Sequence, residues 1–140
     1  MKWMILPYRR YFDFSGRSRR LEYWMFTLFM WVVIIALFVI GALLGRSDPV
    51  AGTGDDISGA GMAVFGVLGL FFLASIIPGL AVQVRRFHDQ DKSGWMVLLG
   101  LIPSVGGLII LFFMLLEGTP GENYYGPDPK GPEFDVDAFA

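Results

Sequence analysis

The residue types best suited to chemistry lie in RRFHDQDKSGW, the polar stretch from Arg85 to Trp95 between two long apolar runs. Its adjacent His88 and Asp89 are of the types that bind a metal ion or relay a proton. His88 is the only histidine and the chain has no cysteine, which excludes multi-histidine and thiolate zinc sites. Neighbouring residues on a helix also point in different directions. We therefore interpret His88 as a structural residue at the membrane interface and expect no metal, no other cofactor and no enzymatic activity.

The stretch from Arg85 to Trp95 should contain the end of one helix and the start of the next. Arg85, Arg86 and His88 are expected at the carboxyl end of a helix, where exposed carbonyl groups favour positive charge by about 0.3 to 1 kcal/mol each. The arginine side chains are long enough to reach the lipid headgroups. Ser93 should cap the following helix, which places Trp95 at interface height.

A second polar block, FDFSGRSRRLEYW at residues 12–24, alternates aromatic and basic side chains. We expect its rings to lie at the headgroup boundary and its arginines to attract anionic lipid at about 1 kcal/mol each. Gly16 should allow a sharp turn, and Ser18 should cap the first membrane helix.

Glu22 lies close to the low-dielectric region and should therefore seek a cation, with Arg85, Arg86 or a neighbouring arginine as the candidates. The two polar blocks together form a candidate polar-interface or lipid-headgroup site, which comprises Arg17, Arg19, Arg20, Glu22, Arg85, Arg86, His88 and Asp89.

The composition predicts an integral membrane protein. Of 140 residues, 54% are hydrophobic and 17% charged, which is more apolar surface than one small domain can bury in a core. The length suits a single membrane domain, residues 1–140. A net charge of −2, with Lys and Arg at the ends of apolar segments, excludes the basic face of a nucleic-acid-binding protein. The expected partner is a bilayer with anionic headgroups.

Three apolar segments are predicted, at residues 23–44, 62–84 and 95–116. The first would measure about 33 Å as a helix, enough to cross a hydrocarbon core of about 30 Å. It is too long for a signal peptide and should be retained. Pro78 should kink the second helix, and Gly41 with Gly45 should permit close approach of another helix. The expected fold is a small all-α membrane bundle.

The third segment is interrupted by Pro103, Gly106 and Gly107, and two interpretations fit it. It is either one kinked helix that crosses the membrane or a re-entrant hairpin that turns at PSVGG, with arms too short to span. Irregular backbone at membrane depth must be covered by protein, and a small chain offers little cover. We therefore favour the kinked crossing.

Basic residues near segment ends resist translocation and so predict orientation. Six lysines and arginines precede Tyr23 and three lie in the second loop, whereas the connection at residues 45–61 has only Arg46. The amino end, residues 1–22, and the second loop are expected in the cytoplasm, and the first connection is expected to be a flexible external turn. Three crossings would put the tail, residues 117–140, outside; a re-entrant third segment would return it to the cytoplasm.

The tail is rich in glycine and proline and should form a series of turns. Asn123 and Asp128 should bond nearby backbone groups, and Tyr124 and Tyr125 should pack along the interface. The acidic end, residues 133–140, is expected to be disordered.

Three separated blocks occur in order along the chain: FSGRSRRLEYW, VQVRRFHDQDKSGW, and LIPSVGG followed by GTPGENYYGPDP. Together they resemble a bacterial inner-membrane family called domain of unknown function 805, over residues 12–129. The resemblance implies a small multi-pass bacterial inner membrane protein. The family brings no established activity, so no catalytic residue can be carried over. If the three blocks recur together in the family, they could form one site on one membrane face, which would favour the re-entrant topology.

The leading functional hypothesis is a non-enzymatic structural or accessory component of a membrane assembly, either a homo-oligomer or part of a larger complex. The alternative is a small transport or lipid-handling protein in which the helix break from Pro103 to Gly107 lines a cavity.

Overall fold

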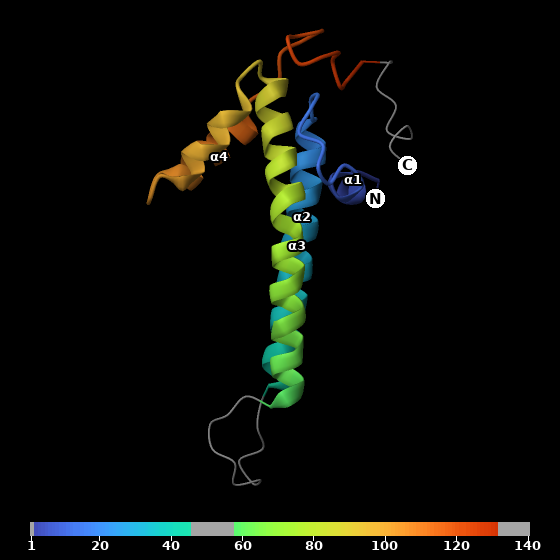
Figure 1. The fold of residues 1–140 in the computed structure, drawn as a ribbon, viewed down its shortest axis with the longest axis vertical. Helices are drawn as coiled ribbons and strands as arrows, with labels where there is room; N and C mark the ends of the chain where they lie inside the picture. Colours follow the sequence, from blue (N-terminus) through green and yellow to red (C-terminus); the bar gives the residue numbers. More distant parts are fainter. Residues whose placement is uncertain (1, 46–57, 132–140) are drawn as a thin grey trace. The chain divides into compact units, whose positions relative to one another are not determined.

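The computed structural model describes residues 2–45 and 58–131, with its helices labelled in Figure 1. In order, the elements are α1 (Lys2–Arg9), α2 (Arg20–Leu44), α3 (Gly59–Asp89), the 3-10 helix η2 (Gly94–Leu101) and α4 (Gly106–Leu115). The described residues contain no β-strand beyond one isolated bridge between Asn123 and Gly126. The predicted all-helical fold is confirmed.

The first two predicted segments are confirmed as helices of membrane length. Residues 23–44 lie in α2 and residues 62–84 lie in α3, and both helices are long and apolar enough to cross a bilayer. Helix α3 continues through Pro78 without ending there. The predicted external turn falls mainly on residues 46–57, and the predicted disordered end on residues 133–140; both lie outside the described residues.

The chain divides into two compact units, residues 28–76 and residues 1–27 with 77–140. In the unit of residues 28–76, the two helices run antiparallel. The rings of Phe38 and Phe65 meet with centroids 6.0 Å apart, and those of Phe29 and Phe71 meet at 6.5 Å. An edge-to-face ring geometry is common in packed aromatic pairs and adds a specific contact to the burial of apolar surface.

The same unit contains a close helix crossing made by glycines. A Cβ atom on Gly61 would lie 2.4 Å from the Cα atom of Gly45 and 3.1 Å from the carbonyl oxygen of Gly41. The backbones can approach this closely only because these positions carry no side chain. The predicted close approach at Gly41 and Gly45 is therefore confirmed, and the helix that approaches is α3 of the same chain.

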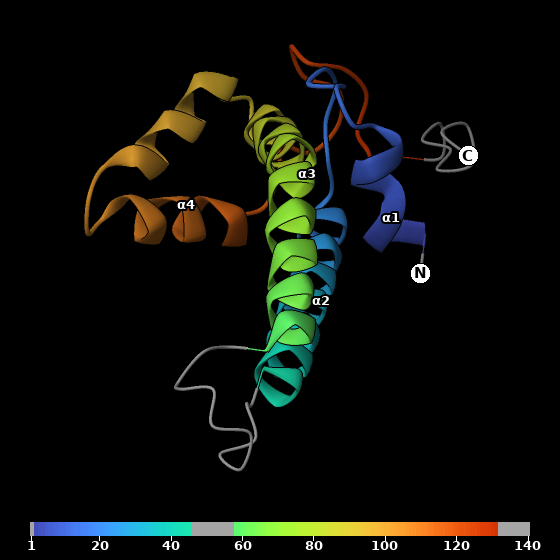
Figure 2. The ribbon, with the colours of Figure 1, turned by 60° about the horizontal axis from the view of Figure 1, so that its bottom comes forward.

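The third apolar segment lies in the other unit and doubles back on itself. Helix α4 begins at Gly106, after a turn in which Ser104 adopts a φ of 69°. The helices η2 and α4 pack against each other, and Figure 2 shows the tight turn that joins them. A Cβ atom on Gly106 would lie 2.5 Å from the carbonyl oxygen of Leu99, so a glycine is needed for this return. The predicted single kinked helix is wrong, and the path of the chain is that of the alternative, a hairpin that turns at PSVGG.

The inner side of the hairpin packs against the end of α3, whereas the turn between its two arms, residues 101–105, is exposed. Phe87, near the end of α3, is fully buried against Ile110 and Met114 of α4. Six further residues pack around this core: Tyr23, Trp24, Met96, Val97, Leu99 and Phe113. The arms contain 8 and 10 residues, and 10 residues of α-helix measure about 15 Å, so neither arm spans alone.

Helix α1 lies within the amino end, residues 1–22, where no helix was predicted. Leu6 and Pro7 are buried, and the ring of Tyr8 lies 5.4 Å from the ring of Phe26 in α2. The amino end is therefore packed against the start of the first membrane helix.

Candidate functional site

Glu22 and Arg85 form a fully buried ion pair. Their Oε1 and Nη2 atoms are 2.9 Å apart, and both side chains are 0% exposed. Glu22 lies in the first turn of α2, and Arg85 lies near the end of α3. The predicted cation partner of Glu22 is therefore confirmed, and among the candidates it is Arg85.

Arg85 also fixes the segment that leads into α2. Its Nε donates to the Ser18 hydroxyl at 3.0 Å, and its Nη1 donates to the carbonyl oxygen of Asp13. The Ser18 backbone N–H in turn donates to the carbonyl oxygen of Arg85 at 3.1 Å. Ser18 was expected to act as a helix cap, and its hydroxyl here accepts from an arginine of another helix.

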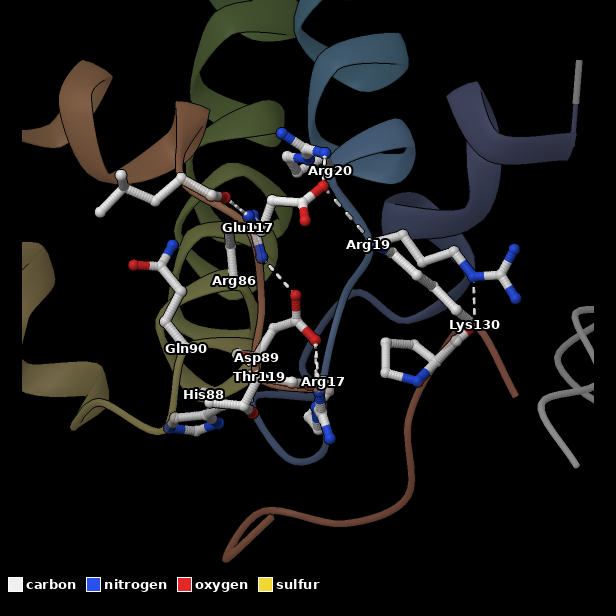
Figure 3. A network of polar contacts seen from close by, with 12 residues as sticks. Arg17, Arg19, Arg20, Arg86, His88, Asp89, Gln90, Glu117, Thr119 and Lys130 are labelled. Atoms are coloured by element: carbon white, nitrogen blue, oxygen red, sulfur yellow. Dashed lines mark hydrogen bonds and ion pairs between the residues drawn. The ribbon is translucent and has the colours of Figure 1, made fainter. Parts of the chain in front are cut away.

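Asp89 lies between two arginines from different parts of the chain, as Figure 3 shows. Its Oδ1 accepts from Arg17 Nε at 3.0 Å, with Arg17 Nη2 2.9 Å away, and its Oδ2 accepts from Arg86 Nη1. All three side chains are buried. Burying charges is costly unless they are paired and hydrogen-bonded, and the carboxylate meets that requirement with both oxygens. We call the five buried residues Arg17, Glu22, Arg85, Arg86 and Asp89 the arginine cluster.

The arginine cluster holds the tail through backbone carbonyl groups. Arg17 donates to the carbonyl oxygens of Thr119 at 2.6 Å and Gly121 at 2.5 Å, and Arg86 donates to that of Leu116. The Thr119 N–H and hydroxyl donate to the carbonyl oxygen of Asp89, at 2.7 and 3.1 Å. The three polar blocks therefore meet at one place. A tail on the opposite side of the membrane from the amino-terminal block, as three crossings predict, does not fit these contacts.

Gly118 makes this contact possible, since a Cβ atom there would lie only 2.0 Å from Asp89 Oδ2. The tail further along forms the predicted turns. Asp128 accepts from the backbone N–H groups of Gly121 at 3.0 Å and Lys130 at 2.8 Å. The Lys130 hydrogen bond is the main cause that lowers the pKa of the Asp128 carboxyl. The predicted backbone bond of Asn123 is confirmed too, because its Oδ1 accepts from the Tyr125 N–H at 2.9 Å.

His88 points away from Asp89, as was expected of adjacent residues on a helix. Its Nδ1 lies 3.1 Å from the carbonyl oxygen of Gly16, and its ring stacks on Tyr125 at a centroid distance of 3.9 Å. A carbonyl oxygen can only accept, so Nδ1 carries the proton, and in the neutral ring Nε2 is then an acceptor. Gly16 adopts a φ of 73°, which confirms the predicted sharp turn.

Exposure separates the predicted site residues into two groups. The five residues of the arginine cluster are buried, so the expectation that Arg17, Arg85 and Arg86 reach the lipid headgroups is wrong. Arg20 forms an exposed pair with Glu117, and Arg19 donates to the carbonyl oxygen of Pro129. Arg19 and Arg20 therefore keep surface that headgroups could contact, and His88 is half-buried.

Several contributors were missed because their types carry no functional signal. Thr119 and Gln90 were not singled out, yet Gln90 donates to the carbonyl oxygen of Phe113 at 2.6 Å and so ties α4 to the residue that follows α3. Ser93 accepts from the Trp95 N–H at 3.4 Å, as its predicted capping role requires. Within the described residues no three His, Asp or Glu side chains gather as metal ligands. The arginine cluster pairs buried charges with one another and holds distant backbone segments together.

Comparison with known proteins finds relatives over nearly the whole chain. The Escherichia coli K12 protein named "Inner membrane protein YhaH" is 45% identical over 132 residues, 93% of this chain and 98% of that protein. "Inner membrane protein YhaI" of the same strain is 40% identical, with 93% and 97% covered. The uncharacterized protein YiiR is 27% identical over 90% of this chain. No solved structure matches.

The family described as "Protein of unknown function (DUF805)" matches residues 11–127. That range contains the arginine cluster and the tail residues that it binds, up to Gly126. This coverage confirms the resemblance drawn from the three sequence blocks, and the chain therefore belongs to the DUF805 family of membrane proteins of unknown function.

Proposed function

We propose that this chain is a non-enzymatic structural or accessory component of an assembly in the bacterial inner membrane. The observation that carries the proposal is the state of Asp89, whose two carboxylate oxygens are both engaged by arginines. An acid or base in catalysis must be able to reach a substrate proton, and a carboxylate clamped in this way cannot. The cluster instead fixes the fold of one end of the protein.

The exposed apolar surface of α2 and α3 supports the proposal that the protein is part of an assembly. Only 6% of the most apolar window of α2 and 11% of that of α3 is buried within the chain. Large side chains such as Trp31 and Leu43 are about 60% exposed. Lipid or further transmembrane helices must cover this surface, and the second possibility makes the protein part of an assembly.

Cysteine crosslinking in native membranes tests the assembly. The chain has no cysteine of its own, so each single cysteine substitution reports on one position. Leu28→Cys, Trp31→Cys and Ile35→Cys place thiols at exposed positions of α2, and Ala81→Cys, which is fully buried, is the matched control. We expect crosslinks to another chain that recur at helical spacing on one face and are absent for the control. Crosslinking no stronger at the exposed positions than at Ala81 would refute the assembly.

We further propose that α2 and α3 both span the membrane, that the η2–α4 hairpin enters and leaves on one side, and that this side is the cytoplasm. The amino-terminal block, the loop before η2 and the tail would then all be cytoplasmic, which agrees with the bias of Lys and Arg toward these segments. A phosphatase reporter, active only outside the cytoplasm, should be inactive when fused after Ala140. An active fusion would refute this orientation of the tail.

The transport alternative receives less support. It requires a cavity lined by the break from Pro103 to Gly107, whereas the pocket described below is lined by residues around His88 and Trp95. Leu101, Ile102 and Val105, at the tip of the hairpin, are exposed.

A further inference from the structure

A pocket of about 500 Å³ lies beside the arginine cluster, within the unit that contains the hairpin. It is formed by the end of α3, the start of η2 and the tail, with Val84, Trp95 and Leu98 among its apolar walls. The stacked rings of His88 and Tyr125 form its polar edge. This volume is typical of pockets that hold one small ligand. None of the five residues of the arginine cluster lines it, so the pocket is a separate feature.

His88 gives the pocket one directed polar group. Its Nδ1 donates a hydrogen bond to the carbonyl oxygen of Gly16, so in the neutral ring Nε2 is free to accept one. A Cβ atom on Gly94, another lining residue, would lie 3.0 Å from His88 Nε2 and 2.6 Å from Val84 Cγ1. The glycine therefore keeps this wall open next to Nε2. A ligand that suits the site has a hydrogen-bond donor at one end and an apolar body.

The surroundings indicate where such a ligand comes from. Trp95 is 78% exposed and Leu98 is 49% exposed, and Leu101, one turn further along η2, is 77% exposed. Helix η2 carries no charged residue. An exposed apolar surface of this kind on a membrane protein is covered by lipid, and tryptophan side chains concentrate at the level of the headgroups. The apolar side of the pocket is thus continuous with a surface that lipid contacts, and its polar edge lies at the arginine-rich end.

We propose that the pocket binds one phospholipid whose headgroup donates a hydrogen bond to His88 Nε2 and whose acyl chain lies along Trp95 and Leu98. Ethanolamine and glycerol headgroups carry N–H or O–H donors. A choline headgroup carries none, so it fits the pocket less well. The site is independent of the assembly proposed above, since it lies within one chain.

Native mass spectrometry of the detergent-purified full chain tests the proposal. The protein is loaded from vesicles of phosphatidylethanolamine or of phosphatidylcholine with the same acyl chains, and bound phospholipid per chain is counted. We expect one retained phosphatidylethanolamine and about fivefold weaker retention of phosphatidylcholine, the size expected for one neutral hydrogen bond. Equal retention of the two lipids would overturn the role of His88, and no retained lipid at all would overturn the site.

One matched pair of variants and one single variant locate the binding. Leu98→Trp should fill the pocket and abolish retention, whereas Leu101→Trp adds the same bulk on the same helix outside the pocket lining and should retain lipid. His88→Phe keeps a ring against Tyr125 but removes the acceptor, so it should retain both lipids equally. Equal loss in Leu98→Trp and Leu101→Trp, or an unchanged headgroup preference in His88→Phe, would contradict the proposal. If Leu98→Trp does not elute as a folded protein, the headgroup preference of His88→Phe alone tests whether the lipid binds at this pocket.

Discussion

Arg17 and Asp89 are 72 positions apart in the sequence and form a buried ion pair with Nη2 and Oδ1 2.9 Å apart. Arg17 belongs to the block before the first membrane helix, and Asp89 ends α3. Arg17 also donates to backbone carbonyl oxygens of the tail. One side chain therefore joins all three polar blocks of the sequence, and this contact can form only if the tail returns to the amino-terminal block.

Asp89→Asn should be strongly destabilising. It leaves the buried guanidinium groups of Arg17 and Arg86 without their anion, and breaking a buried pair from one side costs about 3 to 5 kcal/mol. The measurement is the free energy of unfolding in detergent. Asp91→Asn is the matched control, because Asp91 is exposed and its φ of 55° suits asparagine. A loss at Asp89 no larger than at Asp91 would contradict the structural role of the cluster.

Gly118→Ala should release the tail from the cluster. The added Cβ atom would collide with the Asp89 carboxylate, which has arginines on both sides and cannot move away. We expect faster proteolysis of the tail and a lower melting temperature. Gly107→Ala, where the new Cβ meets nothing within 4 Å, should instead stabilise the α4 helix by up to about 1 kcal/mol. Identical proteolysis of Gly118→Ala and the wild type would show that the tail is not held as described.

Gly61→Ala should separate α2 from α3 where their backbones touch. The Cβ atom would lie 2.4 Å from the Gly45 Cα atom, and backbone atoms cannot move aside as a flexible side chain can. Thermal unfolding should occur at a lower temperature, whereas Gly66→Ala on the same helix, with open space at its Cβ position, should be neutral or stabilising. A neutral result for Gly61→Ala would mean that the helices do not cross at this glycine.

The turn that closes at Asp128 should depend on pH. Two backbone N–H groups hydrogen-bond its ionised form, so its folded pKa lies below the unfolded value. A lowered carboxyl pKa contributes stability that is fully present above the unfolded pKa and is lost as the pH falls through the folded pKa. A carboxyl NMR titration should give a midpoint below the usual range for aspartate, and Asp128→Ala should speed amide exchange at Gly121 and Lys130. A midpoint at or above the usual range would contradict this geometry.

Much of the fold follows from sequence because its causes are local. Uncharged runs of membrane length predict α2 and α3, and Ser93, Gly16 and Asp128 act within a few residues of themselves. The need of Glu22 for a cation was also predicted, with Arg85 among the candidates, since a buried carboxylate must find a positive charge at the same depth. The burial of Arg17 was not predicted, and the hairpin of η2 and α4 was only the less favoured of two interpretations. Both depend on long-range packing around Asp89 and Phe87, which no local pattern encodes.

The most direct test of the central claim uses a membrane-impermeant maleimide on single-cysteine variants in sealed vesicles of known orientation. Phe12→Cys reports on the amino-terminal block, with the native side chain 73% exposed, and Tyr124→Cys reports on the tail, at 90%. If the third segment re-enters and the arginine cluster joins the three blocks, both cysteines react from the same side of the membrane. Reaction from opposite sides would contradict the account.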